Sequence, residues 1–493
     1  EREMFARMLL IREFEEMLSR ANARGEIPTE AIHLSIGQEA CAVGACFALR
    51  RDDYVATTHR GPGPVLAKGA DLDGMMAEML GRASGLCGGK GGSMHLTDAT
   101  VGAIGANGIV GASPLIAAGA AHSARLRGTD QVALAFLGDG ATNQGMFHEA
   151  LNFAAVFDLP AIIVIENNLY GEFTPLSSHS RVERLSDRAA AYGIPGVTVD
   201  GNDVRAVHEA TLTAVTRARS GKGPTLIECL TYRWHGHMEG EEIDYRPAAE
   251  IEEWKTRCPL LALRCRLIAA ETLSVEQADA MAADARAAVA RAYERALASP
   301  APDLAALTTD VYAPEPRSLY TPSRSSTVTR DITCSRALWE ALHEELVRDE
   351  RAYLIGEDVT TGGYFSVTVG LVDEIGRERI VDTPISENAL VGSAVGAAMT
   401  GCRPVVEILF SDFLTTCMDP LVNQAAKLRY MSGGQYRMPL VVRTPGGAGL
   451  GMAAQHSQSL EALLTGIPGL IIVAPATPAD AKGLLKSSIR SNN

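Results

Sequence analysis

Two apolar runs that each end in polar residues constrain the fold of this chain most strongly. The first, residues 132–137, leads directly into Gly-Asp-Gly at 138–140. The second, AIIVI at 161–165, ends at Glu-Asn-Asn, residues 166–168. Because a helix-forming segment around 145–158 separates the runs, we predict two neighbouring buried strands of a parallel sheet. The polar residues would then share the carboxyl edge of the sheet, where open α/β sheets hold their ligands.

The alternation of strand-like and helix-like segments continues along the chain. A third strand is predicted at 225–230, and a later block offers strands at 352–355, 404–409, 439–443 and 469–474. Near-helical spacing of apolar residues predicts an amphipathic helix over 1–21, and the Ala- and Arg-rich stretch 261–298 is mostly helical by propensity. These patterns predict the α/β class, with parallel sheets covered by helices.

Length and composition predict more than one domain. The chain has 493 residues, which is too many for one compact core. Proline and serine cluster over 299–330, as in an extended linker. We therefore predict a first domain at 1–298 and a second at 331–493.

Charge, hydropathy and cysteine content argue against several classes of protein. A net charge of −14 without a basic stripe argues against a nucleic-acid partner. No apolar run approaches the roughly 18 residues of a membrane span. The nine cysteines are odd in number and form no CxxC, which argues against a disulfide framework and for a reducing cytoplasm. The sequence begins at Glu1 without a signal peptide, and the missing initiator Met is consistent with a lost leader.

The polar ends of the first two strands suit a diphosphate that is bridged by a metal. Mg²⁺ prefers oxygen ligands and often takes several of them from phosphate. The Asp139 carboxylate, the Asn168 amide oxygen and one backbone carbonyl would be the ligands from the protein. Gly138 and Gly140 would let the backbone approach the diphosphate, with the start of the following helix aimed at it. A lone Gly-Asp-Gly is more often an ordinary turn, so the prediction depends on both strand ends together.

Other phosphate-binding motifs are not evident in the sequence. The pattern GxxxxGK[ST] does not occur. The stretch GANGIVG at 105–111 is not a convincing dinucleotide fingerprint, because no clear strand precedes it.

Longer motifs resemble one enzyme family. GDGATNQG followed by ENN is similar to the thiamine diphosphate motif, and its neighbours resemble the decarboxylating component of the 2-oxo acid and acetoin dehydrogenase complexes. The motifs similar to the α subunit are HLSIGQEA (33–40), GGKGGSMH (88–95), GANGIVGAS (105–113) and YRWHGH (232–237). The motifs similar to the β subunit are GEDV (356–359), DTPISE (382–387), NQAAKLRYMSGG (423–434), RTPGGAG (443–449) and AAQHSQSLEA (453–462). The chain therefore resembles an α and a β subunit fused head to tail, with two thiamine diphosphate-binding-fold domains.

The resemblance implies a set of residues that bind thiamine diphosphate and Mg²⁺. Asp139, Asn168 and the Tyr170 carbonyl would be the metal ligands. The diphosphate would contact His59, Arg60, Gly138, Gly140, Ala141 and Arg233. Gly108 and Val110 would meet the aminopyrimidine through backbone groups. In the second block, Glu387 would hydrogen-bond the pyrimidine ring nitrogen, and Ile385, Leu409 and Phe413 would pack around that ring.

A carboxylate at the pyrimidine end has a chemical reason. It favours the imino form of the cofactor, whose own amino group removes the thiazolium proton. The alternative interpretation is that Glu387 is an ordinary glutamate at the start of a helix and does not contact the cofactor. The resemblance also assigns substrate orientation and proton transfer to His33, His237 and His456, and supporting places to His95 and His235.

Three departures from the family pattern bear on function. Pro62 and Pro64 stand where acetoin-type relatives commonly have histidines, so the usual substrate handling there is in doubt. Met238 follows His237 where mitochondrial pyruvate enzymes carry a phosphorylated serine, so control by phosphate is not expected. The sequence ends at SSIRSNN, where a complete β subunit continues for another domain. We therefore expect either a truncated chain or a separate chain that carries the transketolase C-terminal domain.

Three functions follow as hypotheses. The first is an oxidoreductase that cleaves a 2-oxo acid such as pyruvate, or an acetoin-like donor, and transfers the acyl unit to a lipoyl carrier. The second is a transketolase-like transferase that passes a two-carbon ketol unit from a ketose phosphate to a carrier protein in a natural-product pathway. The third is a non-catalytic scaffold. The family is oligomeric, so a homodimer is expected.

Overall fold

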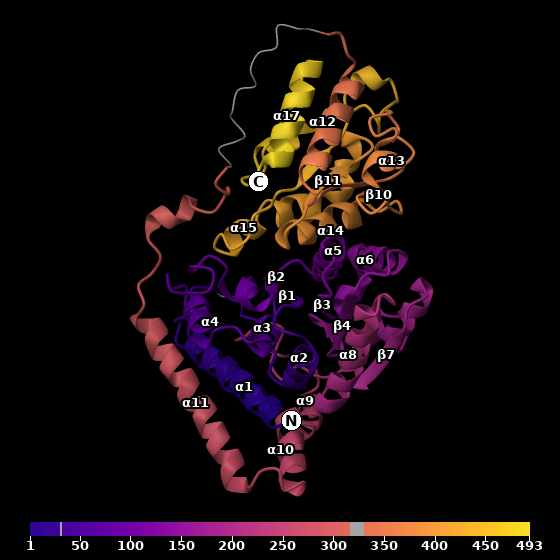
Figure 1. Cartoon of the computed structure of the whole chain (residues 1–493). Coiled ribbons are helices and arrows are strands. Elements are labelled where there is room, and N and C mark those ends of the chain that lie inside the picture. The colour runs from indigo at the N-terminus through magenta and orange to yellow at the C-terminus, as the bar shows by residue number, and fades with distance from the viewer. Residues whose placement is uncertain (30–31, 316–329) are drawn as a thin grey trace. The chain divides into compact units, whose positions relative to one another are not determined.

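The computed structural model describes residues 1–29, 32–315 and 330–493 (Figure 1). It divides into two compact units: the first comprises 1–121, 130–308 and 431–435, and the second comprises 122–129, 309–430 and 436–493. Of the predicted linker 299–330, residues 316–329 lie outside the described part of the chain. Every helix of the described ranges is too short or too polar to cross a bilayer.

The first unit is built on a parallel sheet of six strands in the order β2-β1-β3-β4-β8-β7. Their bounds are β1 Tyr54–Thr58, β2 Ala103–Asn107, β3 Ala133–Gly138, β4 Ala161–Asn167, β7 Gly196–Asp200 and β8 Thr225–Leu230. The predicted pairing of the two apolar runs is confirmed, because β3 and β4 are neighbours with Gly138 opposite Glu166. The strand order reverses between β1 and β3, which is where such sheets hold ligands.

Helices cover this sheet and extend the core. They are α1 Arg2–Ala23, α2 Glu39–Cys46, α3 Pro62–Lys68, α4 Leu72–Met79, α5 Ser113–Leu126, α6 Gly145–Val156, α7 Leu176–His179, α8 Val204–Arg219, α9 Ala248–Thr256, α10 Pro259–Ala269 and α11 Val275–Ala298. The predicted amphipathic helix at the start of the sequence is α1, which buries Phe5, Met8, Phe14 and Leu18 along one stripe. A short hairpin, β5 Tyr170–Gly171 with β6 Thr174–Pro175, follows β4.

The second unit has a parallel sheet of four strands in the order β10-β9-β11-β12. Their bounds are β9 Ala352–Gly356, β10 Ile380–Asp382, β11 Arg403–Glu407 and β12 Val441–Arg443. The helices are α12 Cys334–Arg348, α13 Leu371–Ile375, α14 Glu387–Met399, α15 Leu428–Met431, α16 Glu461–Thr465 and α17 Pro478–Arg490. The α/β class with helix-covered parallel sheets is thus confirmed in both units.

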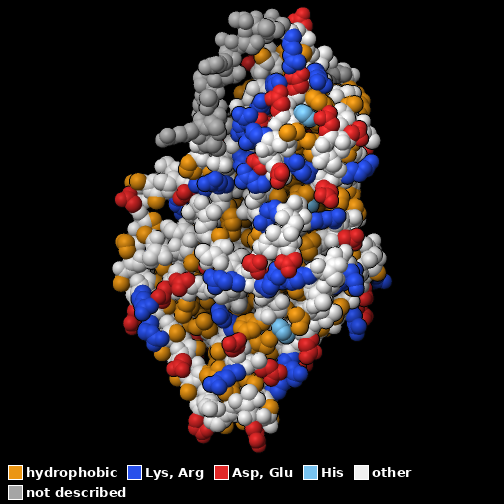
Figure 2. All heavy atoms as spheres, viewed as in Figure 1, with side chains coloured by type: hydrophobic (Ala, Val, Ile, Leu, Met, Phe, Trp, Pro, Cys, Tyr) orange, Lys and Arg blue, Asp and Glu red, His pale blue; other side chains and the backbone are white. Residues whose placement is uncertain are grey.

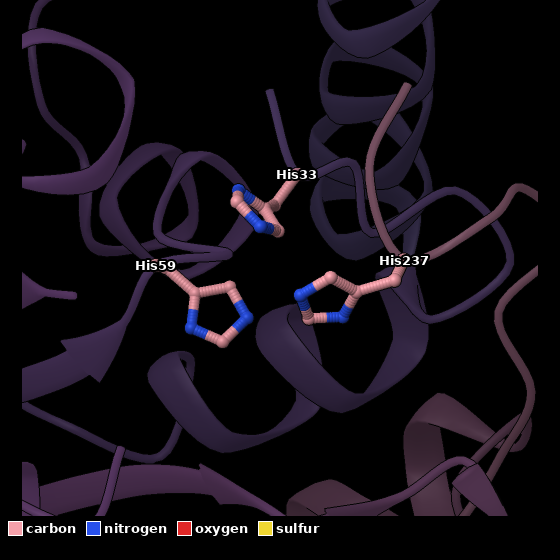
Figure 3. Close-up of side chains that lie close together, drawn as sticks. All are labelled: His33, His59 and His237. Carbon is pink, nitrogen blue, oxygen red and sulfur yellow. The ribbon is translucent and has the colours of Figure 1, made fainter. Parts of the chain in front are cut away.

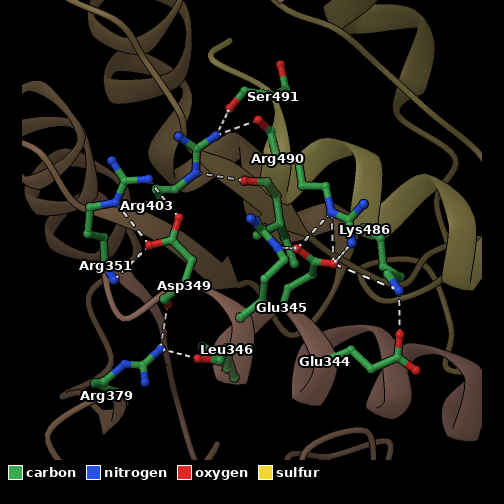
Figure 4. Close-up of polar contacts among 12 residues, drawn as sticks. Glu344, Glu345, Leu346, Asp349, Arg351, Arg379, Arg403, Lys486, Arg490 and Ser491 are labelled. Carbon is green, nitrogen blue, oxygen red and sulfur yellow. Dashed lines mark hydrogen bonds and ion pairs between the residues drawn. The ribbon is translucent and has the colours of Figure 1, made fainter. Parts of the chain in front are cut away.

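Ion pairs join α12 to α17 (Figure 4). The carboxylate of Glu345, fully buried on α12, accepts hydrogen bonds from Arg490 Nε at 3.0 Å. Lys482 and Lys486 of α17 both contact Glu344. Arg403 at the start of β11 donates to the Ile489 carbonyl at 3.0 Å. These contacts hold α17 against the helix that covers the sheet.

The predicted strand at 469–474 is wrong. The segment has no ladder partner among the described residues, and Ile471 and Val473 are 61% and 45% exposed. The edge strand β12 has only three residues, so the apolar run finds neither a partner nor a cover. Without burial, hydrophobicity alone does not form a strand.

Sequence analysis also missed strands β1, β2 and β7, and its statement that no strand precedes GANGIVG is wrong. The sequence of β2 is AIGAN, and its alanine, glycine and asparagine are weak strand formers. All five residues of β2 are nevertheless buried, and the strand pairs with β1. Tertiary burial therefore determines this strand.

The surface carries both signs of charge. Figure 2 shows Lys and Arg side chains interspersed with Asp and Glu over the visible face. All nine cysteines are free thiols.

Candidate active site

The site residues predicted in the first unit follow the carboxyl ends of five neighbouring strands. His59 and Arg60 come directly after β1, Gly108 after β2, Asp139 after β3 and Asn168 after β4, and Arg233 lies three residues beyond β8. Since all these strands are parallel, the residues share one edge of the sheet. This edge includes the point between β1 and β3 where the strand order reverses.

The loops after β3 and β4 touch each other. A Cβ built on Gly140 would lie 2.8 Å from Gly171 Cα, so only glycine fits this approach. A 3₁₀ turn, Gly140–Asn143, separates this point from α6. The loop that carries Asp139 is thereby held against the segment after Asn168 and Tyr170.

Two oxygens in these loops are poorly satisfied. The Asp139 side chain is 1% exposed; its Oδ2 lies 3.2 Å from His179 Nε2, but its buried Oδ1 has no hydrogen-bond partner among the described residues. Asn168 donates from Nδ2 to Gln38 Oε1 at 3.1 Å, while its Oδ1 accepts only a long bond of 3.4 Å from Tyr170 N. A buried carboxylate oxygen without a partner is costly unless a cation or donor occupies its other side.

The neighbouring Asn167 has a structural role. Its Nδ2 donates to Glu228 Oε1 at 2.7 Å, and its Oδ1 accepts from Leu169 N at 3.1 Å. Leu169 has a φ of +72°, a conformation that non-glycine residues rarely adopt. Asn167 therefore fixes the strained turn that presents Asn168.

Two buried guanidinium groups stand at the same edge without a carboxylate partner. Arg60 donates to the Leu34 and His237 carbonyls, both at 2.8 Å, and Arg233 donates to the Glu172 carbonyl at 2.9 Å. Among the residues that the structure describes, neither forms an ion pair with an acid. Burial, with the like charge of Arg233, lowers the pKa of Arg60 to about 9, and burial also lowers the pKa of Arg233. Two desolvated cations that lack a directly paired acid among the described residues form a receptor for an anion.

Three histidines converge beside the arginines (Figure 3). The ring centroids of His33 lie 4.5 Å from His59 and 4.8 Å from His237. Burial, reinforced by the charge of Arg60, lowers the pKa of His33 and of His237 to about 3 and holds the pKa of His59 well below its usual value. All three rings are therefore neutral at physiological pH. The two arginine charges beside His237 also make this cluster unfavourable for a metal cation.

The segment after β2 contacts a second matched motif. A Cβ on Gly108 would lie 3.3 Å from His95 Nε2, and His95 Nδ1 lies 3.1 Å from the Gly91 carbonyl. Burial lowers the pKa of His95. Val110 is 42% exposed.

His235 and the two prolines of the loop after β1 have local structural roles. His235 Nδ1 lies 2.8 Å from Glu239 Oε2, so this ring has a partner outside the histidine cluster. Pro62 and Pro64 lie buried in the first turn of α3, where proline is favoured because its missing N–H is not needed. These prolines start a helix.

In the second unit, Glu387 opens α14 and is half-buried. It lies close enough to Glu357, at the end of β9, to affect its ionisation: burial first, and then the charge of Glu387, raises the pKa of Glu357 to about 7. Glu357 is 7% exposed, and its Oε1 has no partner among the described residues. Ile385 is 83% exposed, so its packing around a cofactor ring stays a prediction.

Aromatic rings surround His456 in this unit. The ring centroid of His456 lies 4.7 Å from that of Phe410 and 5.2 Å from that of Phe413. Leu409, next to Phe410, is half-buried. The predicted residues Phe413 and His456 are therefore in contact.

Comparisons with known proteins identify the family. Residues 6–305 match the family model of the dehydrogenase E1 component, and residues 330–493 match the pyrimidine-binding domain of transketolase. The chain belongs to the dehydrogenase E1 component family. Its α-subunit-like and β-subunit-like parts make it an E1-type enzyme of the thiamine diphosphate-dependent class.

Curated relatives match the first part of this E1 chain. It is 46% identical over 315 residues to the α subunit of acetoin:2,6-dichlorophenolindophenol oxidoreductase of Bacillus subtilis, covering 63% of this chain and 92% of the relative. The Cupriavidus necator subunit of the same name is 45% identical over 310 residues, covering 63% and 93%. The pyruvate dehydrogenase E1 α subunit of Rhizobium meliloti is 41% identical over 308 residues, covering 62% and 88%.

The residues present fit the cofactor of E1 enzymes. The unpartnered Asp139 Oδ1 suits a metal cation, and the glycine contact between the two loops suits close approach of a diphosphate. Among the described residues, Arg60 and Arg233 form no ion pair with an acid, which suits contact with a diphosphate. The donor set of this E1 site therefore matches a metal-bridged diphosphate.

Sequence analysis assigned no role to three residues that shape this site. Gln38 holds Asn168, His179 contacts Asp139, and Arg246 donates to the carbonyls of Arg233 and His235 at 2.7 and 2.6 Å. Gln38 lies inside a quoted motif, HLSIGQEA, and could have been included on that ground. His179 and Arg246 carry no local signal, because only the fold brings them to the strand ends.

Proposed function

We propose that this E1 chain binds thiamine diphosphate through Mg²⁺ and cleaves a 2-oxo acid of the pyruvate type or an acetoin-like donor. The acyl unit would pass to a lipoyl carrier. Thiamine diphosphate supplies, when bound, a carbon nucleophile and an electron sink. The relatives named for acetoin and pyruvate support these two donor classes.

The observation that carries the proposal is a pair of buried guanidinium groups beside a partly unsatisfied carboxylate at the carboxyl edge of the first sheet. Arg60 and Arg233 donate to backbone carbonyls, and neither is directly paired with an acid among the described residues. Asp139 offers a carboxylate oxygen beside them that no donor satisfies. A doubly charged phosphate group together with a divalent cation would satisfy both at once.

Residues of the first unit would bind the cofactor and orient the donor. Asp139, Asn168 and the Tyr170 carbonyl would be the Mg²⁺ ligands. Arg60, Arg233, His59 and the backbone of Gly138, Gly140 and Ala141 would contact the diphosphate. His33 and His237 are held neutral by burial and nearby arginine charge, so each presents an unprotonated ring nitrogen that can accept a hydrogen bond from the donor. The Nδ1 atom of His33 has no partner among the described residues.

Residues of the second unit would contact the aminopyrimidine and the donor. Glu387 would hydrogen-bond the pyrimidine ring, in line with the pyrimidine-binding model that matches this part of the chain. Its carboxylate acts on the buried carboxyl of Glu357, whose raised pKa, caused first by burial, supports a low-polarity environment there. His456, packed on Phe410 and Phe413, would orient the donor.

We include a homodimer in the proposal. Exposed apolar side chains on the second unit, including Ile471 and Val473, support an assembly that covers them. Light scattering of the purified chain tests this part, and a monomer would exclude it.

The test is a donor panel with the full-length chain. Calorimetry should register thiamine diphosphate binding that requires Mg²⁺. Pyruvate, acetoin and a ketose phosphate are then supplied separately with an artificial electron acceptor, and carbon dioxide and aldehyde products are measured. We expect turnover of pyruvate or acetoin.

Two results would overturn the proposal. Turnover of the ketose phosphate alone would replace it with ketol transfer. No cofactor binding would replace it with a non-catalytic scaffold. Acyl transfer is tested separately with a lipoylated peptide, whose failure to become acylated during turnover would exclude the lipoyl acceptor.

A further inference from the structure

The first unit contains a cavity whose lining includes Trp234, the residue after Arg233. Its volume is about 360 Å³, within the range of small-molecule sites. Helices α1, α10 and α11 form most of its wall, and α1 packs directly against both of the others (Figure 1). The lining residues are Phe5, Leu9, Arg12, Trp234, Lys255, Cys258, Leu260, Leu261, Arg264, Ala278, Asp279 and Ala282.

The lining combines an apolar wall with one buried guanidinium nitrogen that has no partner among the described residues. Phenylalanine, leucine, tryptophan and alanine side chains make up the wall. The three cations of the lining each contact an acid: Arg12 contacts Glu39, Lys255 contacts Glu252 at 2.8 Å, and Arg264 contacts Asp279. Asp279 is already paired with Arg264 at 2.8 Å. Arg12 Nε donates to Glu39 at 2.5 Å, but its buried Nη2 has no hydrogen-bond partner among the described residues. A ligand with an apolar body and one negative charge complements this lining.

Trp234 lines the cavity and also packs against Gly37. Arg12 lies over its indole ring, 4.3 Å from the centroid. On another side the indole packs so closely on Gly37 that an added Cβ there would lie 2.6 Å from Trp234 Cδ1. The residue after Gly37 is Gln38, which holds Asn168. Trp234 itself directly follows Arg233 in the chain.

Arg12 reaches the same loop by a second route. Its partner Glu39 also accepts a hydrogen bond from Gly37 N at 3.2 Å through the same oxygen, Oε1. A ligand that draws Arg12 toward the cavity, or presses on Trp234, therefore acts on the segment that positions Gln38. Both routes end at the residue that holds Asn168.

We propose that this cavity is an effector site for a small carboxylate with an aliphatic or aromatic body, and that its occupancy changes the affinity of the active site for thiamine diphosphate. The coupling part, unlike the binding part, rests on the proposed function. By reciprocity, cofactor binding changes the affinity for the carboxylate by the same factor.

Hexanoate is the probe, and 1-hexanol is its uncharged counterpart. Calorimetry on the full-length chain should show that hexanoate binds at least about tenfold more tightly than 1-hexanol, a difference of about 1.4 kcal/mol that reflects a charged hydrogen bond from Arg12 Nη2. Equal affinity of the two compounds would refute the charge argument. No hexanoate binding would refute the site.

Neighbouring alanines on α11 give a matched pair of variants. Ala282→Leu fills the cavity, whereas Ala283→Leu adds the same side chain at an exposed position that does not line it. Leucine is a good helix former, so both variants should fold. We expect Ala282→Leu to weaken hexanoate binding at least about tenfold and Ala283→Leu to leave it unchanged. Equal binding by both variants would place hexanoate elsewhere.

The coupling is measured as cofactor affinity with and without saturating hexanoate. We expect at least a twofold change in wild type and in Ala283→Leu, and none in Ala282→Leu. An unchanged cofactor affinity in wild type would refute the coupling while leaving the carboxylate site established. If the chain binds hexanoate but no cofactor at all, the proposed function fails and the binding site stands.

Discussion

Replacing Asp139 by Asn should separate cofactor affinity from stability. In the cofactor-free protein, Asp139 Oδ2 makes one contact, to His179, and Oδ1 makes none among the described residues. Losing the His179 contact costs about 1 kcal/mol, and neutralising a buried, unsatisfied carboxylate returns about 1–3 kcal/mol. The two terms nearly cancel, so the free energy of unfolding should change by less than about 2 kcal/mol.

Cofactor binding should respond much more strongly to Asp139→Asn. The substitution removes the only full charge among the three expected Mg²⁺ ligands. Loss of groups that merely support metal ligands costs about 10- to 100-fold in affinity, so loss of the ligand itself should cost at least about 100-fold, or roughly 2.7 kcal/mol. A loss of cofactor-binding free energy that is larger than the change in the free energy of unfolding would indicate that Asp139 is a metal ligand.

Two measurements on each variant test this prediction. Calorimetry gives the affinity for thiamine diphosphate at fixed Mg²⁺, and urea unfolding without ligand gives the stability. Asp158→Asn is the matched control, because it makes the same change at an exposed residue before β4, at the opposite edge of the sheet. Asparagine also tolerates the φ of +45° at that position. Cofactor affinity in Asp139→Asn within threefold of wild type would refute the metal site.

Three further predictions follow from single residues. Glu387→Gln should lower donor turnover at least about 100-fold while the thermal midpoint is retained; near-wild-type rates would exclude its role. Burial raises the pKa of Glu166 from 4.5 to about 7, so the stability that depends on its protonated form is fully present below pH 4.5 and is lost as pH rises through 7. In urea unfolding, the free energy of unfolding of Glu166→Gln should not show this loss of about 3 kcal/mol as pH rises. If the free energies of unfolding of variant and wild type changed with pH in parallel, Glu166 would not be the group responsible. Gly37→Ala should lower the free energy of unfolding by about 3 kcal/mol, because φ is +100° and the new Cβ would lie 2.6 Å from Trp234. The control is Gly25→Ala, which has a φ of +69° but no neighbouring atoms near the new Cβ, and it should lower the free energy of unfolding by about 1 kcal/mol. Equal unfolding midpoints for the two glycine variants would show that the Trp234 contact relaxes freely.

Part of the sheet could be predicted because apolar runs in the local sequence indicate buried strands. Strand β3 and the first five residues of β4 are continuous apolar runs, and β8 is mostly apolar; both faces of such strands are covered in a parallel sheet. The short edge strand β2 could not be predicted, since its residues are weak strand formers that are held by β1. The run 469–474 shows the converse case: it is apolar, but it does not form a strand because it pairs with no strand among the described residues.

The same division holds for the site. Asp139 and Asn168 were predictable, because parallel strands must place their carboxyl ends along one edge. Family motifs added Arg60, Arg233 and the histidines by resemblance. The sequence could not reveal that neither arginine forms an ion pair with a described acid, or that burial keeps three histidines neutral, because each property depends on what the other loops bring near.

The sequence by itself determined the buried strands β3, β4 and β8, the polar residues that follow β3 and β4 and the family to which those motifs belong. These features are local: hydrophobic runs and turn residues act over a few positions. Only the tertiary structure decided the strand order, which carboxylate oxygen has no partner among the described residues and where Trp234 lines a cavity. Desolvation and pairing depend on groups brought together from distant parts of the chain, and local sequence does not specify those distances.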